Sequence, residues 1–242
     1  MQYGIERQPH PRTNTSILFM SAHPEWGSSR MRGFQIMDEW KRKNNSYQSD
    51  GVAVCSRDQC ADICIFIGPC QDHGLPSKSC CKVKVLDVID KLLYPEKRFI
   101  LGHLHEYDAI IVNSSFMKKY FRQELGYNGS IEVLLHHSDP RWHMTKTNVS
   151  SQSLQFGYIG TLGAISHGNF ENHEILTKLY PITLVETGKV IGSEVTFEMD
   201  LSLRQLGNPF AQFKTSAKVA TAAALGHNII TTWEEATRDC LP

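Results

Sequence analysis

The sequence predicts an α/β protein with two parallel-sheet domains, the second of them short. Short apolar runs rich in branched residues alternate with segments of helical periodicity, which is typical of a parallel sheet with crossover helices. This alternation stops at a polar stretch, residues 136–153, and then begins again. We therefore expect one domain over residues 1–150, linker included, and a second over residues 151–242.

The first half opens with a strand, a polar glycine loop and a helix. Residues 15–20 form an apolar run that predicts a buried strand. Apolar residues at helical spacing predict a helix over residues 31–43. The same reasoning predicts the other elements of this half, which are strands at 52–55, 62–67, 108–113 and 131–135 and helices at 83–93 and 116–125.

The second half restarts with a strand at residues 154–159, followed by a glycine loop at 160–163. Periodicity predicts the rest of this half, which consists of helices at 169–179 and 217–225 and strands at 182–185, 195–201 and 229–231.

The helix at residues 217–225 is rich in alanine, with a threonine or serine at 215–216 to cap its start and Gly226 to end it. Alanine side chains are small, so the backbone of this helix can approach a sheet or a ligand closely. Unpaired N–H groups and the helix dipole favour an anion at its N-terminus, and Lys214 and Lys218 lie within about one turn of that end. The stretch predicts a phosphate site, with an ordinary crossover helix as the alternative.

The charge balance argues against large electrostatic surfaces. Lysine plus arginine equals aspartate plus glutamate at 25 each, so the formal net charge is zero and no nucleic-acid partner is expected. No apolar stretch approaches the roughly 20 residues that span a bilayer, and the polar N-terminus does not resemble a signal sequence. We expect a soluble, cytoplasmic protein.

Six of the seven cysteines fall between Cys55 and Cys81. Their spacings never give the Cys-X-X-Cys knuckle of a zinc site, and the total is odd. We therefore expect free thiols in a reducing compartment, with a zinc site as the alternative. Five Asn-X-Ser/Thr triplets are interpreted as chance matches, because Asn113 ends an apolar strand and would lie too close to the core to carry a glycan.

Several motifs, taken in order, resemble a known family. They are Asp108-Ala-Ile-Ile-Val-Asn-Ser114 with its helix, His-His-Ser-Asp139-Pro after a strand, Phe156-Gly-Tyr-Ile-Gly160, and residues 213–230. Together they cover about residues 15–242 and resemble the two-domain sugar-nucleotide glycosyltransferases of the GT-B fold.

The resemblance implies two Rossmann-like domains that face a cleft, the N-terminal one holding the acceptor and the C-terminal one a nucleotide-diphosphate sugar. Members of this fold usually continue with further helices, so we expect the C-terminal domain to be incomplete, with a minimal donor domain as the alternative. The implied reaction transfers a sugar to a glycan or other hydroxyl acceptor, as in polysaccharide biosynthesis. It needs no cofactor beyond the donor substrate and allows a peripheral membrane contact.

A leaving diphosphate gains negative charge as the glycosidic bond breaks, so it needs backbone N–H groups and cations around it. Within the implied fold, glycine loops, basic residues and the end of the last strand supply these groups. The candidate donor-binding residues are Gly27, Ser28, Arg30, Gly160, Thr161, Arg204, Lys214, Lys218, Thr232 and Glu234.

A catalytic base must reach the acceptor hydroxyl directly or through one water. His23 and Glu25 lie in the first glycine loop and His105 precedes a strand, so these three are the candidates, each with a plain structural role as the alternative. The chain contains no Asp-X-Asp pair and no compact spacing of histidines with carboxylates. We expect no metal and a metal-independent transfer.

Two other functions remain open on the sequence. Residues 157–163, Gly-Tyr-Ile-Gly-Thr-Leu-Gly, prompt an NAD-dependent epimerase or dehydrogenase, although Gly157 would lie inside a strand and no Tyr-X-X-X-Lys pair follows. A non-catalytic nucleotide- or glycan-binding module of the same fold is the other alternative.

Overall fold

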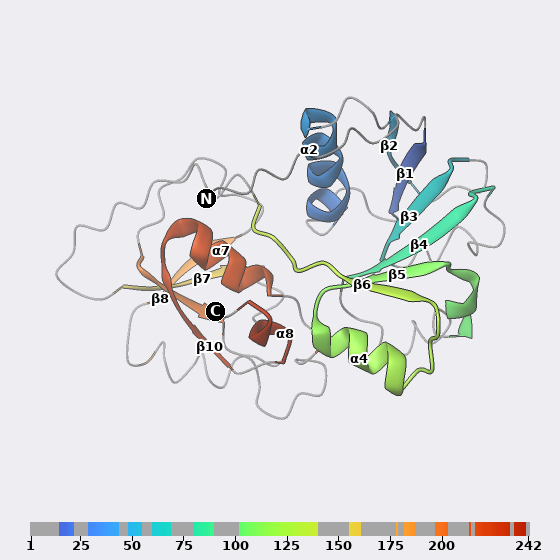
Figure 1. Cartoon of the computed structure of the whole chain (residues 1–242). Helices are drawn as coiled ribbons and strands as arrows, with labels where there is room; N and C mark the ends of the chain where they lie inside the picture. Colours follow the sequence, from blue (N-terminus) through green and yellow to red (C-terminus); the bar gives the residue numbers. More distant parts are fainter. Residues whose placement is uncertain are drawn as a thin grey trace, which may run out of the picture. The chain divides into compact units, whose positions relative to one another are not determined.

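The structure is a computed structural model of the whole chain (Figure 1). Residues 1–86 with 106–108 form one compact unit, and residues 87–105 with 109–242 form a second. This division passes through a strand of the first sheet, so the boundary near residue 150 stays a prediction. The described residues are 15–21, 29–43, 48–54, 60–68, 80–89, 102–139, 155–160, 178, 182–186, 197–202, 213, 216–232 and 235–240.

Six strands form the first sheet, in the order β2-β1-β3-β4-β5-β6. β1 pairs in parallel with both β2 and β3, and β5 pairs in parallel with β6. The chain therefore changes direction across the sheet at β1, which is the switch point of a doubly wound fold. The strands are β1 (Ser16–Ser21), β2 (Gln48–Val54), β3 (Ile63–Ile67), β4 (Val83–Val88), β5 (Ala109–Val112) and β6 (Ser130–Val133).

Four strands form the second sheet, in the order β10-β9-β7-β8. β7 pairs in parallel with β8 and with β9, and β10 pairs in parallel with β9. The switch point of this sheet lies between β7 and β9. The strands are β7 (Phe156–Gly160), β8 (Ile182–Glu186), β9 (Met199–Ser202) and β10 (Asn228–Thr231). Two parallel sheets of this kind confirm the predicted α/β class and are consistent with two Rossmann-like domains.

Capping residues mark the start of α4 and the end of α7. Ser114 caps α4, its hydroxyl accepting a hydrogen bond from the N–H of Met117 at 3.2 Å. Gly226 ends α7 in the left-handed conformation, with φ of 72°. The helices are η1 (Arg30–Phe34, a π-helix), α2 (Gln35–Lys43), η4 (Leu104–Glu106, a 3-10 helix), α4 (Ser115–Gln123), α7 (Ala217–Leu225) and α8 (Glu235–Arg238).

The predicted helix over residues 83–93 is wrong, because residues 83–88 form β4. The helical spacing of its apolar residues was a coincidence of a short run. Leu86, Asp87 and Val88 are all buried, at 1%, 1% and 3% exposure, as expected of a strand with neighbours on both sides. The predicted helix at 169–179 lies outside the described residues except for Lys178, which is helical.

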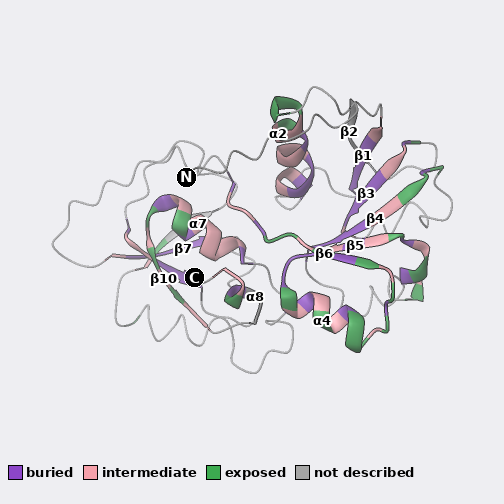
Figure 2. Ribbon diagram, in the orientation of Figure 1, coloured by how far each residue is buried: buried purple, intermediate pink, exposed green. Residues whose placement is uncertain are grey.

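The core of the first sheet is built from its inner strands (Figure 2). Leu18, Phe19 and Met20 of β1 are at most 4% exposed, and Cys64 of β3 is fully buried. Phe121 of α4 is fully buried as well. Continuous burial along a strand is expected where helices cover a parallel sheet.

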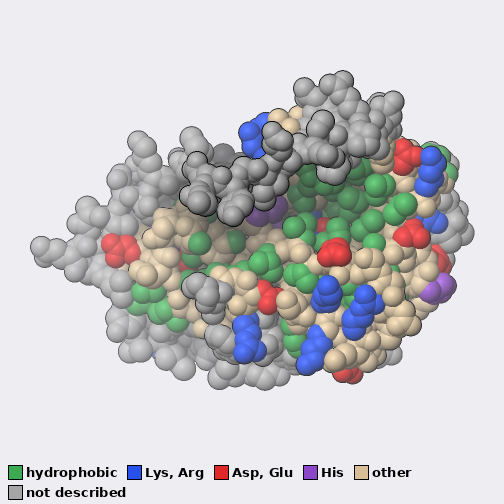
Figure 3. Space-filling model, viewed as in Figure 1, with side chains coloured by type: hydrophobic (Ala, Val, Ile, Leu, Met, Phe, Trp, Pro, Cys, Tyr) green, Lys and Arg blue, Asp and Glu red, His purple; other side chains and the backbone are tan. Residues whose placement is uncertain are grey.

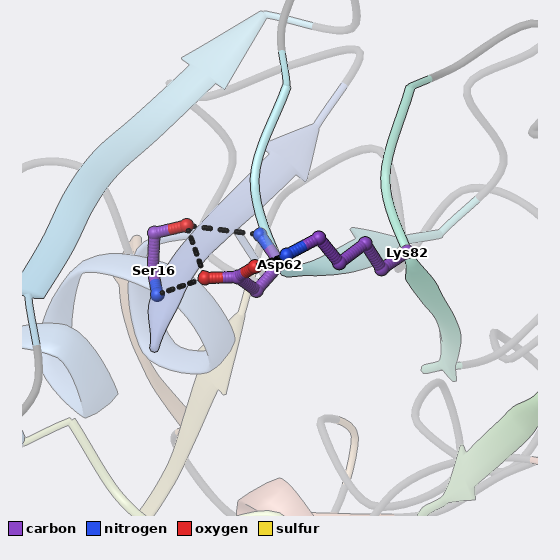
Figure 4. Close-up of polar contacts among 3 residues, drawn as sticks. All are labelled: Ser16, Asp62 and Lys82. Atoms are coloured by element: carbon purple, nitrogen blue, oxygen red, sulfur yellow. Dashed lines mark hydrogen bonds and ion pairs between the residues drawn. The ribbon is translucent and has the colours of Figure 1, made fainter. Parts of the chain in front are cut away.

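The amino ends of β1, β3 and β4 are joined by a polar cluster (Figure 4). Asp62 accepts hydrogen bonds from the N–H and the hydroxyl of Ser16, at 2.9 and 3.0 Å, and from the ammonium of Lys82. The hydroxyl of Ser16 in turn accepts from the N–H of Asp62 at 2.9 Å. These donors, Lys82 first, lower the pKa of the Asp62 carboxyl to about 2.

Two disulfides lie at the same end of β3 and β4, so the prediction of free thiols is wrong for four cysteines. Cys60 is bonded to Cys80 and Cys64 to Cys81. The sequence could not reveal this pairing, since it depends on β3 and β4 being neighbours and residues 83–93 were expected to be a helix. Cys240 is a free thiol, and Cys55 and Cys70 lie outside the described residues.

Basic and acidic side chains are interspersed on the face of the molecule shown in Figure 3, in keeping with a formal net charge of zero. Within the described part of the chain, no helix is both long enough and apolar enough to cross a bilayer.

Candidate functional site

The carboxyl ends of β7, β9 and β10 share one edge of the second sheet, because these strands are parallel neighbours. Gly160 ends β7 and Ser202 ends β9. Thr231 ends β10, and its hydroxyl donates to the carbonyl of Ser202 at 3.1 Å. Thr232 follows, its N–H pointing to the same carbonyl at 3.4 Å. Two residues predicted from the sequence, Gly160 and Thr232, therefore lie at the edge where open α/β sheets bind ligands.

The N-terminus of α7 lies at this edge as well. Two residues join the end of α7 to the amino end of β10, which is parallel to β9, so the C-terminus of α7 lies at the amino edge and the helix runs opposite to the strands. Alanines fill most of α7, which keeps the helix thin on the sheet. Its first N–H groups and its dipole therefore favour an anion at the edge that carries Gly160 and Thr232.

Ser216 occupies the N-cap position of α7 but does not cap it. Its side chain is 1% exposed and makes no capping hydrogen bond. Across the part of the chain that the structure describes, its hydroxyl oxygen has no hydrogen-bond partner. A buried hydroxyl without a partner is costly, so this oxygen marks a place where a further hydrogen-bonding group would be stabilised.

Lys218 is directed toward the sheet. Its ammonium nitrogen lies 3.5 Å from the centroid of the Tyr158 ring on β7, close enough for a cation–π contact. Burial raises the pKa of the Asp200 carboxyl, and the charge of Lys218 offsets a part of this rise. The lysine predicted to bind phosphate therefore places its charge over the Tyr158 ring of β7.

A buried aspartate and histidine form a pair that the sequence did not reveal. Asp200 of β9 and His227, which precedes β10, approach to 3.0 Å between Oδ2 and Nδ1, and their side chains are 7% and 2% exposed. Burial raises the pKa of the Asp200 carboxyl, while His227 and Lys218 lower it in part. The ring of Phe197 lies 5.3 Å from that of His227. Within the described residues, Nε2 of His227 has no hydrogen-bond partner.

This pair lies at the amino ends of β9 and β10, away from the carboxyl edge. Asp200 is the second residue of β9, and His227 comes directly after the turn at Gly226. We interpret the pair as the support that fixes the return from α7 into β10. The sequence signal was a histidine next to a helix-ending glycine, which carries no information about a partner 27 residues away.

In the first sheet, the carboxyl end of β1 leads toward η1. The hydroxyls of Ser21 and Ser29 are hydrogen-bonded at 2.6 Å and both residues are buried. Arg30 opens η1, and among the described residues its Nε is a buried nitrogen without a hydrogen-bond partner. π-Helical turns are frequent at functional sites, and a buried guanidinium N–H suits an anion. Arg30, predicted from the sequence to bind the diphosphate, therefore lies at the start of η1, after the carboxyl end of β1.

His105, a predicted base, lies in η4 and is exposed, with its ring 6.1 Å from that of His103. Asn113 directly follows β5 and is 1% exposed. The prediction that it is too buried to carry a glycan is therefore confirmed. Its side-chain N–H donates to the carbonyl of Ile89.

The remaining predicted site residues lie outside the described residues, so their placement is untested. They are His23, Glu25, Gly27, Ser28, Thr161, Arg204, Lys214 and Glu234. Among the residues that are described, no group of three or more histidines, cysteines and carboxylates is placed to hold a metal ion.

Comparison with known proteins identified no family for this chain. No protein-family model matches it, and no curated protein matches it either.

Proposed function

We propose that the chain is a metal-independent glycosyltransferase that uses a nucleotide-diphosphate sugar as donor and a glycan or other hydroxyl as acceptor. The proposal rests on one observation at the N-terminus of α7. There a 1% exposed serine hydroxyl without a described partner lies at the positive end of a helix dipole, at the carboxyl edge of a parallel sheet.

In the proposed reaction, the acceptor oxygen forms a bond to the anomeric carbon while the bond from that carbon to the diphosphate oxygen breaks. The nucleoside diphosphate leaves with the bonding electrons, and the acceptor proton passes to a base. His23, Glu25 and His105 are the candidates for this base. The helix end stabilises the leaving diphosphate because it offers donors where negative charge develops.

In the proposed donor site, backbone groups, hydroxyls and charged side chains bind different parts of the donor. The α7 N–H groups and Ser216 bind the diphosphate, with Gly160 allowing a close approach of the backbone. Lys218 adds positive potential over the Tyr158 ring of β7, and Thr232 lies where donor hydroxyls would be bound. Thr161, Arg204, Lys214 and Glu234 complete the proposed site from segments outside the described residues.

The alternative of an NAD-dependent enzyme has less support from the geometry. Gly157 lies inside β7, where a Cβ atom would collide with the ring of the fully buried Phe197. Packing against Phe197 therefore accounts for this glycine, whereas a dinucleotide fingerprint needs its glycines in the turn after the strand.

A substitution at Ser216 tests the proposed site. Ser216→Asp would place a negative charge where the diphosphate is proposed to bind. We expect binding of uridine, guanosine or adenosine diphosphate, whichever the wild-type protein binds in calorimetry, to weaken by at least about tenfold.

Two variants control for size and for charge. Ser216→Asn has nearly the same shape as Ser216→Asp without the charge, and we expect it to bind the nucleotide more tightly than the aspartate variant. Asn228→Asp adds the same charge at the exposed start of β10, on the opposite edge of the sheet, and should leave binding unchanged. Equal binding by Ser216→Asp and the wild type would exclude this site. Release of nucleoside diphosphate from nucleotide sugars would then separate a transferase from a non-catalytic module.

A further inference from the structure

The two disulfides occupy adjacent positions on the same pair of strands. Cys60 and Cys80 have Cα atoms 5.0 Å apart, and Cys64 and Cys81 have Cα atoms 5.8 Å apart. Cys80 and Cys81 are consecutive residues just before β4, and both partners belong to the β3 segment. Two bridges therefore join the same two chain segments side by side.

The two bridges differ in their access to solvent. Cys60 and Cys80 are both exposed, whereas Cys64 is 0% and Cys81 7% exposed. Exchange requires a thiolate to reach one sulfur of the disulfide, so access sets which bridge can react. A reductant in solution can reach Cys60–Cys80, and the protein covers Cys64–Cys81.

The amino ends of these strands do not depend on the outer bridge alone. Asp62 holds both Ser16 and Lys82 at the same end of the sheet, and Cys64–Cys81 joins β3 to β4 beneath the surface. Opening the outer bridge would therefore leave the strand ends joined by one covalent link and by the polar cluster.

From this arrangement we propose that Cys60–Cys80 is an exchange site for a dithiol–disulfide oxidoreductase, and that Cys64–Cys81 is a structural bridge that such an enzyme does not open. A thiolate of the oxidoreductase attacks one sulfur of Cys60–Cys80, and the released cysteine leaves as a thiolate. The second thiol of the oxidoreductase then attacks the mixed disulfide. The oxidoreductase ends as a disulfide, and Cys60 and Cys80 end as two thiols, so two electrons have passed to this chain.

The proposal is independent of the proposed transferase activity and bears on the compartment. Disulfides form and persist mainly in oxidising surroundings. The two disulfides therefore call for a thiol oxidant during maturation, in contrast to the cytoplasmic, reduced protein expected from the sequence, whereas the proposed exchange at Cys60–Cys80 is a later reduction of this chain.

Graded reduction tests the difference between the bridges. The full chain, purified in air, is treated with increasing dithiothreitol, alkylated with iodoacetamide and digested, and each cysteine peptide is measured by mass spectrometry. Cys240 is the internal standard, since it should be alkylated without any reductant. We expect Cys60 and Cys80 to become alkylated at least about tenfold faster than Cys64 and Cys81. Equal rates, the reverse order, or alkylation of all four without reductant would overturn the proposal.

Capture of the partner tests the exchange itself. A Cys-X-X-Cys oxidoreductase whose second cysteine is replaced by serine arrests at the mixed disulfide, so it should be trapped on Cys60 or Cys80. The Cys60→Ser/Cys80→Ser variant should lose this adduct, while Cys240→Ser, the matched control, should keep it. Capture at any other cysteine, or no capture, would contradict the proposal. Should the double variant fail to fold, the graded reduction of the wild-type chain still decides.

Discussion

The strands around the switch point follow the same order in both sheets, β2-β1-β3-β4 in one and β8-β7-β9-β10 in the other, but different chemistry holds their amino ends together. In the first sheet, an exposed ion pair and two disulfides join β3 to β4, and hydrogen bonds between Ser16 and Asp62 join β1 to β3. In the second, a buried aspartate and histidine join β9 to the start of β10.

The difference lies in the chemistry of the amino edge, because both sheets place charged groups there. The side-chain contacts named at the carboxyl ends are hydrogen bonds between neutral groups, from Thr231 to the carbonyl of Ser202 and between Ser21 and Ser29. The supports should then respond to different conditions, the first to reductant and acid, the second to the ionisation of a buried carboxyl.

Removal of Asp200 should produce the largest effect. Asp200→Ala leaves both ring nitrogens of the buried His227 without the partners described above, and a buried polar group that loses its partner is costly. We expect the free energy of unfolding, measured with urea, to fall by about 3 kcal/mol. Asn228→Ala, at the neighbouring exposed position, should change it by less than about 0.5 kcal/mol. Similar losses in the two variants would show that the pair does not support the second sheet.

Acid should affect the two carboxyls in opposite directions. The folded pKa of Asp62 is about 2, below its unfolded value, so its stabilisation is present above about pH 4 and is lost as the pH falls through 2. Burial raises the folded pKa of Asp200, so its contribution is present below about pH 4 and is lost as the pH rises through the folded value.

Melting temperatures of two isosteric variants measure this contrast. Relative to the wild type, Asp62→Asn should become less stable as the pH rises from about 2 to about 5, because it lacks the gain made by the carboxylate. Asp200→Asn should become relatively more stable with rising pH, because it has no buried carboxyl to ionise. Slopes of the same sign in the two variants would mean that the comparison between the sheets is wrong.

Local patterns in the sequence predicted many of the helices and strands, but the sequence did not reveal which distant segments pair. The strand expected at 108–113 is β5 (Ala109–Val112), and the alanine helix expected at 217–225 is α7 with Gly226 at its end. Such elements depend on residues close in sequence. β4 was missed because three apolar residues at helical spacing in a short run do not distinguish a helix from a strand buried on both faces.

The candidate site could be predicted only in part. Helix chemistry located the N-terminus of α7, and strand ends located Gly160 and Thr232 at the same edge. The direction of the Lys218 side chain, which lies over Tyr158, could not be predicted from the sequence. The partner of Asp200 could not be predicted either, because the contact with His227 forms only once β9 and β10 are paired.

The smallest effect concerns the glycines in left-handed conformation that follow α4 and α7. Gly126 follows α4 with φ of 64°, and Gly226 follows α7 with φ of 72°, and a Cβ atom at either would meet open space. Gly126→Ala and Gly226→Ala should therefore each cost about 1 kcal/mol of unfolding free energy, from backbone strain alone. Gly102→Ala is the matched control, since this glycine also faces open space but has no positive φ, and it should cost less than about 0.5 kcal/mol. A much larger loss at Gly226 than at Gly126 would mean that the turn also positions His227 against Asp200, so that strain and the buried pair act together in the second sheet.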